Sequence, residues 1–257
     1  MTRRQFTSLA GSAVAAFVTG SACRLDASLP AFGDGRLKSR PKPNVKTTAS
    51  FRVPLGLGGT RDGFLQMPAV VPDTPMPLFV CLHGASSSAA TQIARFNLIP
   101  SDAGVAVLGI DSRGQTWDGV MGGGMGPDVE FIDRALDKVF GLISVDPARL
   151  AIGGFSDGAT YGLSLGLING DLFPRIAAFS TGYLLPVDPH GKPRIFMSHG
   201  LSDDILPIDQ CGRVVAADLR KRGYDVTFRE FAGKHEVTPA IATEGFQWLA
   251  RPGTATT

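Results

Sequence analysis

Residues 154–158 (Gly-Phe-Ser-Asp-Gly) place a serine between two glycines in the pattern G-x-S-x-G. The apolar residues 150–153 before it predict a buried strand, and residues 159–165 after it predict a helix. So sharp a turn from strand to helix imposes strained dihedral angles on the serine and exposes its hydroxyl at the end of the strand. We therefore expect Ser156 to be a nucleophile; a glycine-rich turn with a capping serine is the alternative.

A serine hydroxyl reacts readily only when a base accepts its proton, and histidine suits that task near neutral pH. The chain has four histidines: His83, His190, His199 and His235. The strand–serine–helix turn resembles that of the α/β-hydrolases, in which the chain order is serine, carboxylate, histidine; that order would exclude His83. His235 follows the last predicted strand and leaves a strand-end carboxylate between itself and Ser156. We expect His235 to be the base and His199 to be a structural histidine.

The intervening carboxylate lies in residues 199–207 (His-Gly-Leu-Ser-Asp-Asp-Ile-Leu-Pro), at the end of a predicted strand. Asp203 and Asp204 both stand there, and the residues alone leave the two as alternatives. The acid would orient the imidazole and stabilise its protonated form without accepting the proton.

Attack on an acyl group creates an oxyanion that needs two hydrogen-bond donors. One candidate is the backbone N–H of Asp157, directly after the nucleophile, and the second is expected in the loop after the strand that ends at Leu82. That loop, residues 83–88, reads His-Gly-Ala-Ser-Ser-Ser. We expect the N–H of Ala85 to be the second donor; an ordinary loop with serine caps is the alternative.

Four motifs occur in a fixed order: residues 82–84, 154–158, 199–207 and 233–237. Together they resemble the bacterial carboxylesterase and phospholipase-type α/β-hydrolases, and the related poly(3-hydroxybutyrate) depolymerase-like and feruloyl esterases. The resemblance spans about residues 51–250 and implies that Asp203 is the acid and His235 the base. The chain departs from the family at Asp157, where Gln or His is frequent, and at Lys234, where glycine is frequent.

The chain from residue 51 onward alternates between strand-like and helix-like segments. The predicted strands are 51–55, 63–67, 77–82, 104–110, 149–155, 176–180, 194–198 and 224–231, and the predicted helices are 88–96, 127–140, 157–168, 208–222 and 239–250. Continuous apolar strands between helices predict a mostly parallel central sheet covered on both faces. We therefore expect an α/β-hydrolase fold over residues 51–252, without a separate cap domain.

Composition narrows the possible partners. The chain has 257 residues, 44% of them hydrophobic, and a formal net charge of only +2, so nothing favours nucleic-acid binding. No spacing of metal ligands is visible, and we expect neither a metal nor another cofactor. Cys81 and Cys211 are interpreted as free thiols, although sequence cannot show whether they approach each other.

The first 23 residues read as an export signal, because Arg3 and Arg4 precede Phe6 and a short apolar stretch in the manner of a twin-arginine signal. Cys23 ends a segment similar to a lipoprotein cleavage box, so membrane attachment by acylation and plain cleavage are both open. Residues 24–50 are basic and contain three prolines, which predicts a flexible linker. We expect an exported protein of the periplasm or cell surface.

The motifs favour a serine hydrolase that cleaves carboxylic esters through an acyl-enzyme intermediate. Trp117 and Tyr183 are candidates for an apolar wall that binds a small or polymer-derived ester substrate; a packing role is the alternative for both. Two alternatives stay open: an acyltransferase that uses the same three residues, and a surface lipoprotein that keeps the fold for binding without turnover.

Overall fold

The structure of the chain is a computed structural model that describes residues 34–122 and 124–252. The predicted export signal, residues 1–23, and Cys23 with its possible acylation lie outside the described residues. Within them, no helix is long and apolar enough to span a membrane.

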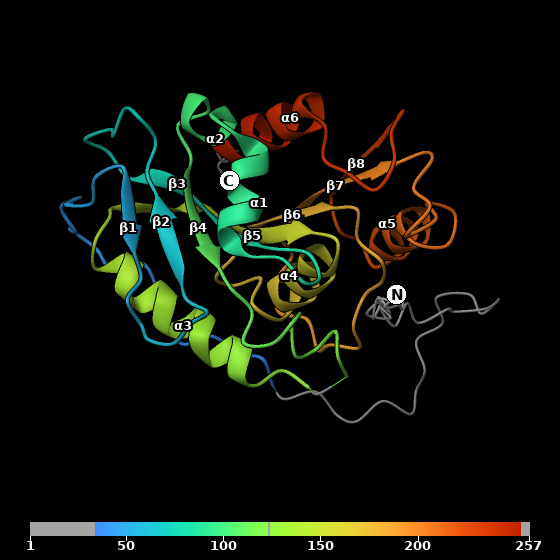
Figure 1. Cartoon of the computed structure of the whole chain (residues 1–257), viewed down its shortest axis with the longest axis horizontal. Coiled ribbons are helices and arrows are strands. Elements are labelled where there is room, and N and C mark those ends of the chain that lie inside the picture. The colour runs from blue at the N-terminus through green and yellow to red at the C-terminus, as the bar shows by residue number, and fades with distance from the viewer. Residues whose placement is uncertain (1–33, 123, 253–257) are drawn as a thin grey trace, which may run out of the picture.

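An eight-stranded sheet forms the centre of the fold (Figure 1). Its strands lie in the order β1-β2-β4-β3-β5-β6-β7-β8. Strands β3 to β8 run parallel to one another. At the edge of the sheet, β2 is antiparallel to β4, and β1 is antiparallel to β2. The bounds are β1 Arg52–Pro54, β2 Gly63–Gln66, β3 Met76–Leu82, β4 Ala106–Ile110, β5 Val145–Phe155, β6 Arg175–Phe179, β7 Arg194–Gly200 and β8 Val226–Phe231. The predicted mostly parallel sheet is confirmed.

The central strands are apolar throughout because both faces of the sheet are covered. In β3, Leu78 and Val80 point into one hydrophobic cluster, whereas Phe79 and Cys81 point into another. Side chains alternate between the faces of a strand, so the two clusters are the two cores of a three-layer fold. Cys81 and Cys211 form no disulfide, as expected.

Helices cover each core. The helices are α1 Ala89–Phe96, α2 Ile99–Asp102, α3 Pro127–Phe140, α4 Asp157–Ile168, α5 Gly212–Lys221 and α6 Pro239–Ala250. Helices α3, α4 and α5 pack on one face of the sheet, and α1 and α6 pack on the other with α2 beside α6 (Figure 1). The bounds of α3, α4 and α6 are those predicted, whereas the short α2 was not anticipated. The link from β6 to β7, residues 180–193, contains no helix or strand.

Residues 34–50 correct the prediction of a flexible linker, because they are held against α3 and the end of α4. Arg36 forms two hydrogen bonds of 2.8 Å with the carboxylate of Asp171. Leu37 is only 2% exposed, and its N–H donates to the side chain of Asn169 (2.9 Å). The N–H groups of Lys38 and Ser39 both donate to one Asp133 oxygen at 2.8 Å. The folded unit therefore includes residues 34–50, which we name the N-terminal strap.

Candidate active site

Ser156 stands between the end of β5 and the start of α4, as the sequence predicted. Its backbone has φ 56° and ψ −120°, a left-handed conformation that non-glycine residues rarely adopt. Such strain costs on the order of 1–3 kcal/mol and persists only where the surroundings enforce it. Here the N–H of Ser156 donates to the carbonyl of Phe179 on the neighbouring strand (3.0 Å). The constrained turn projects the hydroxyl from the carboxyl end of the sheet.

The two glycines of the motif allow the strand and the helix to approach at this turn. A Cβ atom on Gly154 would lie 2.1 Å from the carbonyl oxygen of Leu82, and one on Gly158 would lie 2.3 Å from the same oxygen. Both distances are shorter than any real contact of a Cβ atom, so each position requires glycine. The turn can therefore lie directly against the end of β3.

His235 joins the serine to a carboxylate. Its Nε2 lies 2.9 Å from Ser156 Oγ, and its Nδ1 lies 2.8 Å from Asp203 Oδ2. An ionised carboxylate only accepts hydrogen bonds, so Nδ1 carries the proton and Nε2 presents a lone pair to the serine hydroxyl. The loop from β8 to α6 holds the ring, which packs against Phe155 with 4.8 Å between ring centroids. The three predicted residues thus lie in one hydrogen-bonded chain.

Asp203, not its neighbour Asp204, makes this contact. The Asp203 side chain has no exposed surface, and its Oδ1 accepts the backbone N–H groups of Ile205 (3.0 Å) and Leu206 (2.8 Å). Asp204 is exposed on the same loop. The turn after β7 therefore decides between two carboxylates that the residues alone left open.

His83 is buried and fully engaged elsewhere. Its Nδ1 lies 2.6 Å from the carbonyl of Gly84, while its Nε2 accepts from the N–H of Ser112 (3.0 Å) and lies 3.0 Å from Arg61 Nη2. Since Arg61 and the Ser112 N–H are donors, the proton of the neutral ring is on Nδ1 and points to Gly84. Burial lowers the pKa of His83, so this neutral form is favoured.

The predicted oxyanion donors flank the serine. Gly84 lies against it, since a Cβ on Gly84 would be 3.3 Å from Ser156 Cβ. His83 fixes the Gly84 carbonyl, and because a trans peptide points its N–H the opposite way, it also fixes the N–H of Ala85. The N–H of Asp157 belongs to the first turn of α4 and has no acceptor within that helix. Among the described residues, neither N–H is engaged by another backbone or side-chain acceptor.

The carboxylate of Asp157 is turned toward a neighbouring loop. Its Oδ2 accepts the hydroxyl of Thr116 at 2.7 Å. The departure from the family pattern at this position thus ties the start of α4 to the loop after β4.

Trp117 does not line the site, which corrects its prediction as an apolar wall. The side chain has no exposed surface, its Nε1 donates to the carbonyl of His83 (2.9 Å), and its ring stacks on Tyr161 with centroids 5.2 Å apart. Trp117 is therefore a core residue that supports the loop carrying Ala85. Tyr183 is 37% exposed on the link after β6 and stays a candidate.

Two residues near the site were missed as contributors. Arg61 bonds the ring of His83 and also donates to the carbonyls of Ser87 (3.1 Å) and Ser112 (2.5 Å). His199 contacts Asp203, with 3.2 Å between Nε2 and Oδ2. No local pattern singles out Arg61; for His199, its position four residues before Asp203 was the available signal.

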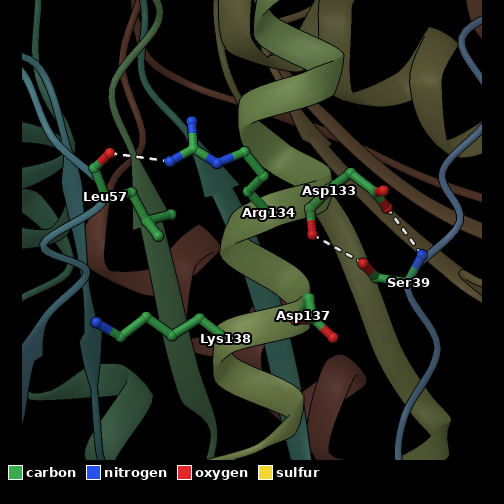
Figure 2. Close-up of a pocket in the computed structure, with 6 residues that line it drawn as sticks. All are labelled: Ser39, Leu57, Asp133, Arg134, Asp137 and Lys138. Atoms are coloured by element: carbon green, nitrogen blue, oxygen red, sulfur yellow. Dashed lines mark hydrogen bonds between the residues drawn. The ribbon is translucent and has the colours of Figure 1, made fainter.

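A cavity of about 380 Å³ lies away from the three residues, beside α3 and the N-terminal strap (Figure 2). It is lined by Ser39, Leu57, Asp133, Arg134, Asp137 and Lys138. Its charged groups are already engaged: Asp133 binds the strap, Arg134 donates to the Leu57 carbonyl (3.0 Å), and Asp137 pairs with Lys42 (2.8 Å). Among the described residues, no group of three or more His, Cys, Asp or Glu side chains is arranged so that it could hold a metal ion.

The three residues lie within a stretch of the chain that matches a known protein family. The phospholipase/carboxylesterase family matches residues 125–245, a range that contains Ser156, Asp203 and His235. Acyl-protein thioesterase 1 of Gibberella zeae is 31% identical over 103 residues, which cover 36% of this chain and 43% of that protein. NocK of Nocardia uniformis subsp. tsuyamanensis, which its name places provisionally among the esterases, is 27% identical over 185 residues, covering 67% and 53%. The chain spans about half the length of these curated relatives.

A solved structure supports the same architecture. The carboxylesterase of Bacillus cereus superposes with a TM-score of 0.58 at 15% identity, over 75% of this chain and 94% of that protein. At this identity the likeness concerns the fold alone.

Proposed function

We propose that this chain, an α/β-hydrolase, is a serine hydrolase that cleaves carboxylic esters through an acyl-enzyme on Ser156. The observation that carries the proposal is the unbroken chain of hydrogen bonds from Ser156 Oγ through His235 to Asp203, at 2.9 and 2.8 Å. The names of the relatives, which include an acyl-protein thioesterase and a carboxylesterase, support acyl chemistry of this kind.

In the first half of the reaction, the serine oxygen attacks the carbonyl carbon of the ester while His235 Nε2 takes the hydroxyl proton. The carbonyl oxygen becomes an oxyanion, which the N–H groups of Ala85 and Asp157 would bind. When the tetrahedral adduct collapses, the bond to the alcohol oxygen breaks and His235 returns its proton to that oxygen. The alcohol leaves, and the acyl group stays on Ser156.

The second half repeats these steps with water. His235 takes a proton from a water molecule, whose oxygen attacks the acyl carbon, and the serine oxygen leaves with that proton. The imidazole is 14% exposed, so water can reach it from solvent. Throughout, Asp203 stays ionised, keeps the proton of the neutral ring on Nδ1 and stabilises the imidazolium that forms.

The substrates proposed are small esters or ester groups of a polymer, because the link between β6 and β7 builds no helix over the site. From residues 1–23 we further propose export to the periplasm or cell surface, with acylation of Cys23 as a possible anchor. Fractionation of cells that express the chain or its Cys23→Ser variant tests this, because only loss of membrane attachment in the variant supports the anchor.

A panel of nitrophenyl esters with acyl chains of increasing length tests the activity. The wild-type chain should hydrolyse at least one of them, and Ser156→Ala should lose at least about a thousandfold in kcat. A folded wild-type protein that cleaves no activated ester, or a Ser156→Ala variant of undiminished rate, would refute the proposal. Added alcohols show whether the acyl group passes to water or to another acceptor.

A further inference from the structure

His199 brings a second imidazole to the carboxylate of Asp203. It lies on β7 with its side chain fully buried. One edge of the ring packs on the first residue of α5, where a Cβ on Gly212 would lie 2.5 Å from Nδ1. At the other edge, Nε2 lies 2.7 Å from the carbonyl oxygen of Leu206 and 3.2 Å from Asp203 Oδ2. The oxygen that receives the N–H of His235 therefore also lies beside His199.

The neighbours of the ring define its protonation. The Leu206 carbonyl and the Asp203 carboxylate only accept hydrogen bonds, so Nε2 carries a proton. Nδ1 is buried without a hydrogen-bond partner among the described residues. Burial is the main influence on the pKa of His199 and lowers it, so the ring is neutral, with a lone pair on Nδ1. His199 is thus a donor without a charge.

Other charged groups around the two imidazoles lie toward the surface. Glu230 faces His199 from β8, but it pairs with Arg213 at 2.6 Å. Around His235 and Asp203 are the exposed residues Lys234, Glu236 and Asp204, with Arg95 over the far side of Phe155. Within the buried contact itself, the ionisable groups are Asp203, His199 and His235.

We propose that His199 is a positioning residue that acts through Asp203, holding its carboxylate in place and reducing the charge that this carboxylate offers to His235. The inference rests on the proposed function, because it assigns a role within that reaction. Asp203 receives three N–H groups, from Ile205, Leu206 and His235, and the Nε2–H of His199, which donates to the Leu206 carbonyl, lies beside Oδ2 at 3.2 Å. The N–H dipole of neutral His199 attracts the charge on this oxygen and so lowers the charge that the oxygen offers to the imidazolium of His235.

Removing the N–H dipole of His199 should leave more of the charge on Asp203 Oδ2 available to His235. The protonated form of His235 would then be favoured, and the acidic limb of the pH–rate profile would move to higher pH. The loop of residues 203–206 would also lose the contact that joins it to β7, so the reaction would slow at every pH.

Two substitutions separate these effects. His199→Phe keeps an aromatic ring without a donor, whereas His199→Gln can place an amide N–H near the position of Nε2. We expect His199→Phe to lower kcat/KM about tenfold on the pH plateau and to move the acidic limb up by about half a pH unit. We expect His199→Gln to restore the limb and most of the rate. His190→Phe, an exposed control on the link before β7, should match wild type.

A proton NMR spectrum gives a readout that needs no turnover. The N–H proton between His235 and Asp203 should resonate further downfield in His199→Phe, because no second N–H dipole then lies beside Oδ2. If His199→Phe does not fold, Gly212→Ala carries the test by pressing a methyl group against Nδ1. It should move the limb in the same direction by a smaller amount.

The outcomes distinguish the inference from the proposed function. If wild type cleaves esters while the limb and the resonance are the same in wild type and His199→Phe, or in Gly212→Ala where the former is unfolded, the role of His199 is wrong. The same holds if His199→Gln is as impaired as His199→Phe. If wild type cleaves no ester, the proposed function fails, and the NMR comparison still tests the effect of His199 on Asp203.

Discussion

Substitution of Asp203 by asparagine, with Asp204→Asn as its matched control, tests whether the Asp203 carboxylate orients His235. In wild type, Oδ1 of Asp203 receives two backbone N–H groups and Oδ2 receives the N–H of His235. Asparagine can keep the first pair of bonds through its carbonyl oxygen, but its NH₂ group then faces the N–H of His235. The imidazole must move its proton to Nε2, where no lone pair is left for the hydroxyl of Ser156.

The expected loss follows from that wrong tautomer. We expect kcat for an activated ester to fall by about 10³–10⁴ in Asp203→Asn, which corresponds to about 4–5.5 kcal/mol of transition-state stabilisation. Asp204 is exposed and should tolerate asparagine within about twofold. Steady-state rates at saturating ester, with circular dichroism to confirm folding, measure both. Equal losses in the two variants, or an Asp203→Asn rate within tenfold of wild type, would show that the carboxylate does not orient His235.

Other predictions concern stability and its dependence on pH. Leu37→Ala should lower the free energy of unfolding by about 2–4 kcal/mol in urea titrations, because Leu37 is 2% exposed. The control Leu98→Ala, at a position 64% exposed, should change it by less than about 0.5 kcal/mol. Similar values for the two variants would mean that the N-terminal strap does not contribute to the folded unit. Burial lowers the pKa of His83 and of His199, so below about pH 6.5 the unfolded chain binds protons that the folded chain resists. The free energy of unfolding should therefore fall as the pH drops from 6.5 toward 5, by up to about 1.4 kcal/mol per pH unit for each histidine, and a flat profile between pH 7 and 5 would contradict this.

Much of the fold was predictable because its signals are local. Proline at the start of α3 and of α6, at Pro127 and Pro239, marks positions where a missing N–H costs nothing. The G-x-S-x-G motif around Ser156 marks the start of α4 in the sequence. The convergence of the site residues was equally predictable from the sequence. Each stands after a predicted strand, and parallel strands end at one edge of the sheet.

The remainder depends on contacts between distant parts of the chain. The strap is basic and contains proline, which is typical of linkers. However, the Arg36 guanidinium donates to Asp171, and the backbone N–H of Lys38 donates to Asp133, residues about a hundred positions away. Trp117 is compatible with a rim as well as with a core, and only the stacking on Tyr161 decides between them.

Details of the site depend on loop geometry in the same way. The choice of Asp203 over Asp204 follows from the turn after β7, which spacing does not fix. The spacing of four residues between His199 and Asp203 was a signal for their contact, but the 3.2 Å between Nε2 and Oδ2 depends on how the loop folds back on β7.

Labelling with a fluorophosphonate tests the central claim most directly, because the reagent phosphonylates a serine only where a base activates it. Intact mass spectrometry should show one adduct per wild-type chain, peptide mapping should place it on Ser156, and His235→Ala should label at least about a hundredfold more slowly. Labelling at another residue, or an unchanged rate in His235→Ala, would mean that the hydrogen-bonded chain from Ser156 to Asp203 does not activate the hydroxyl.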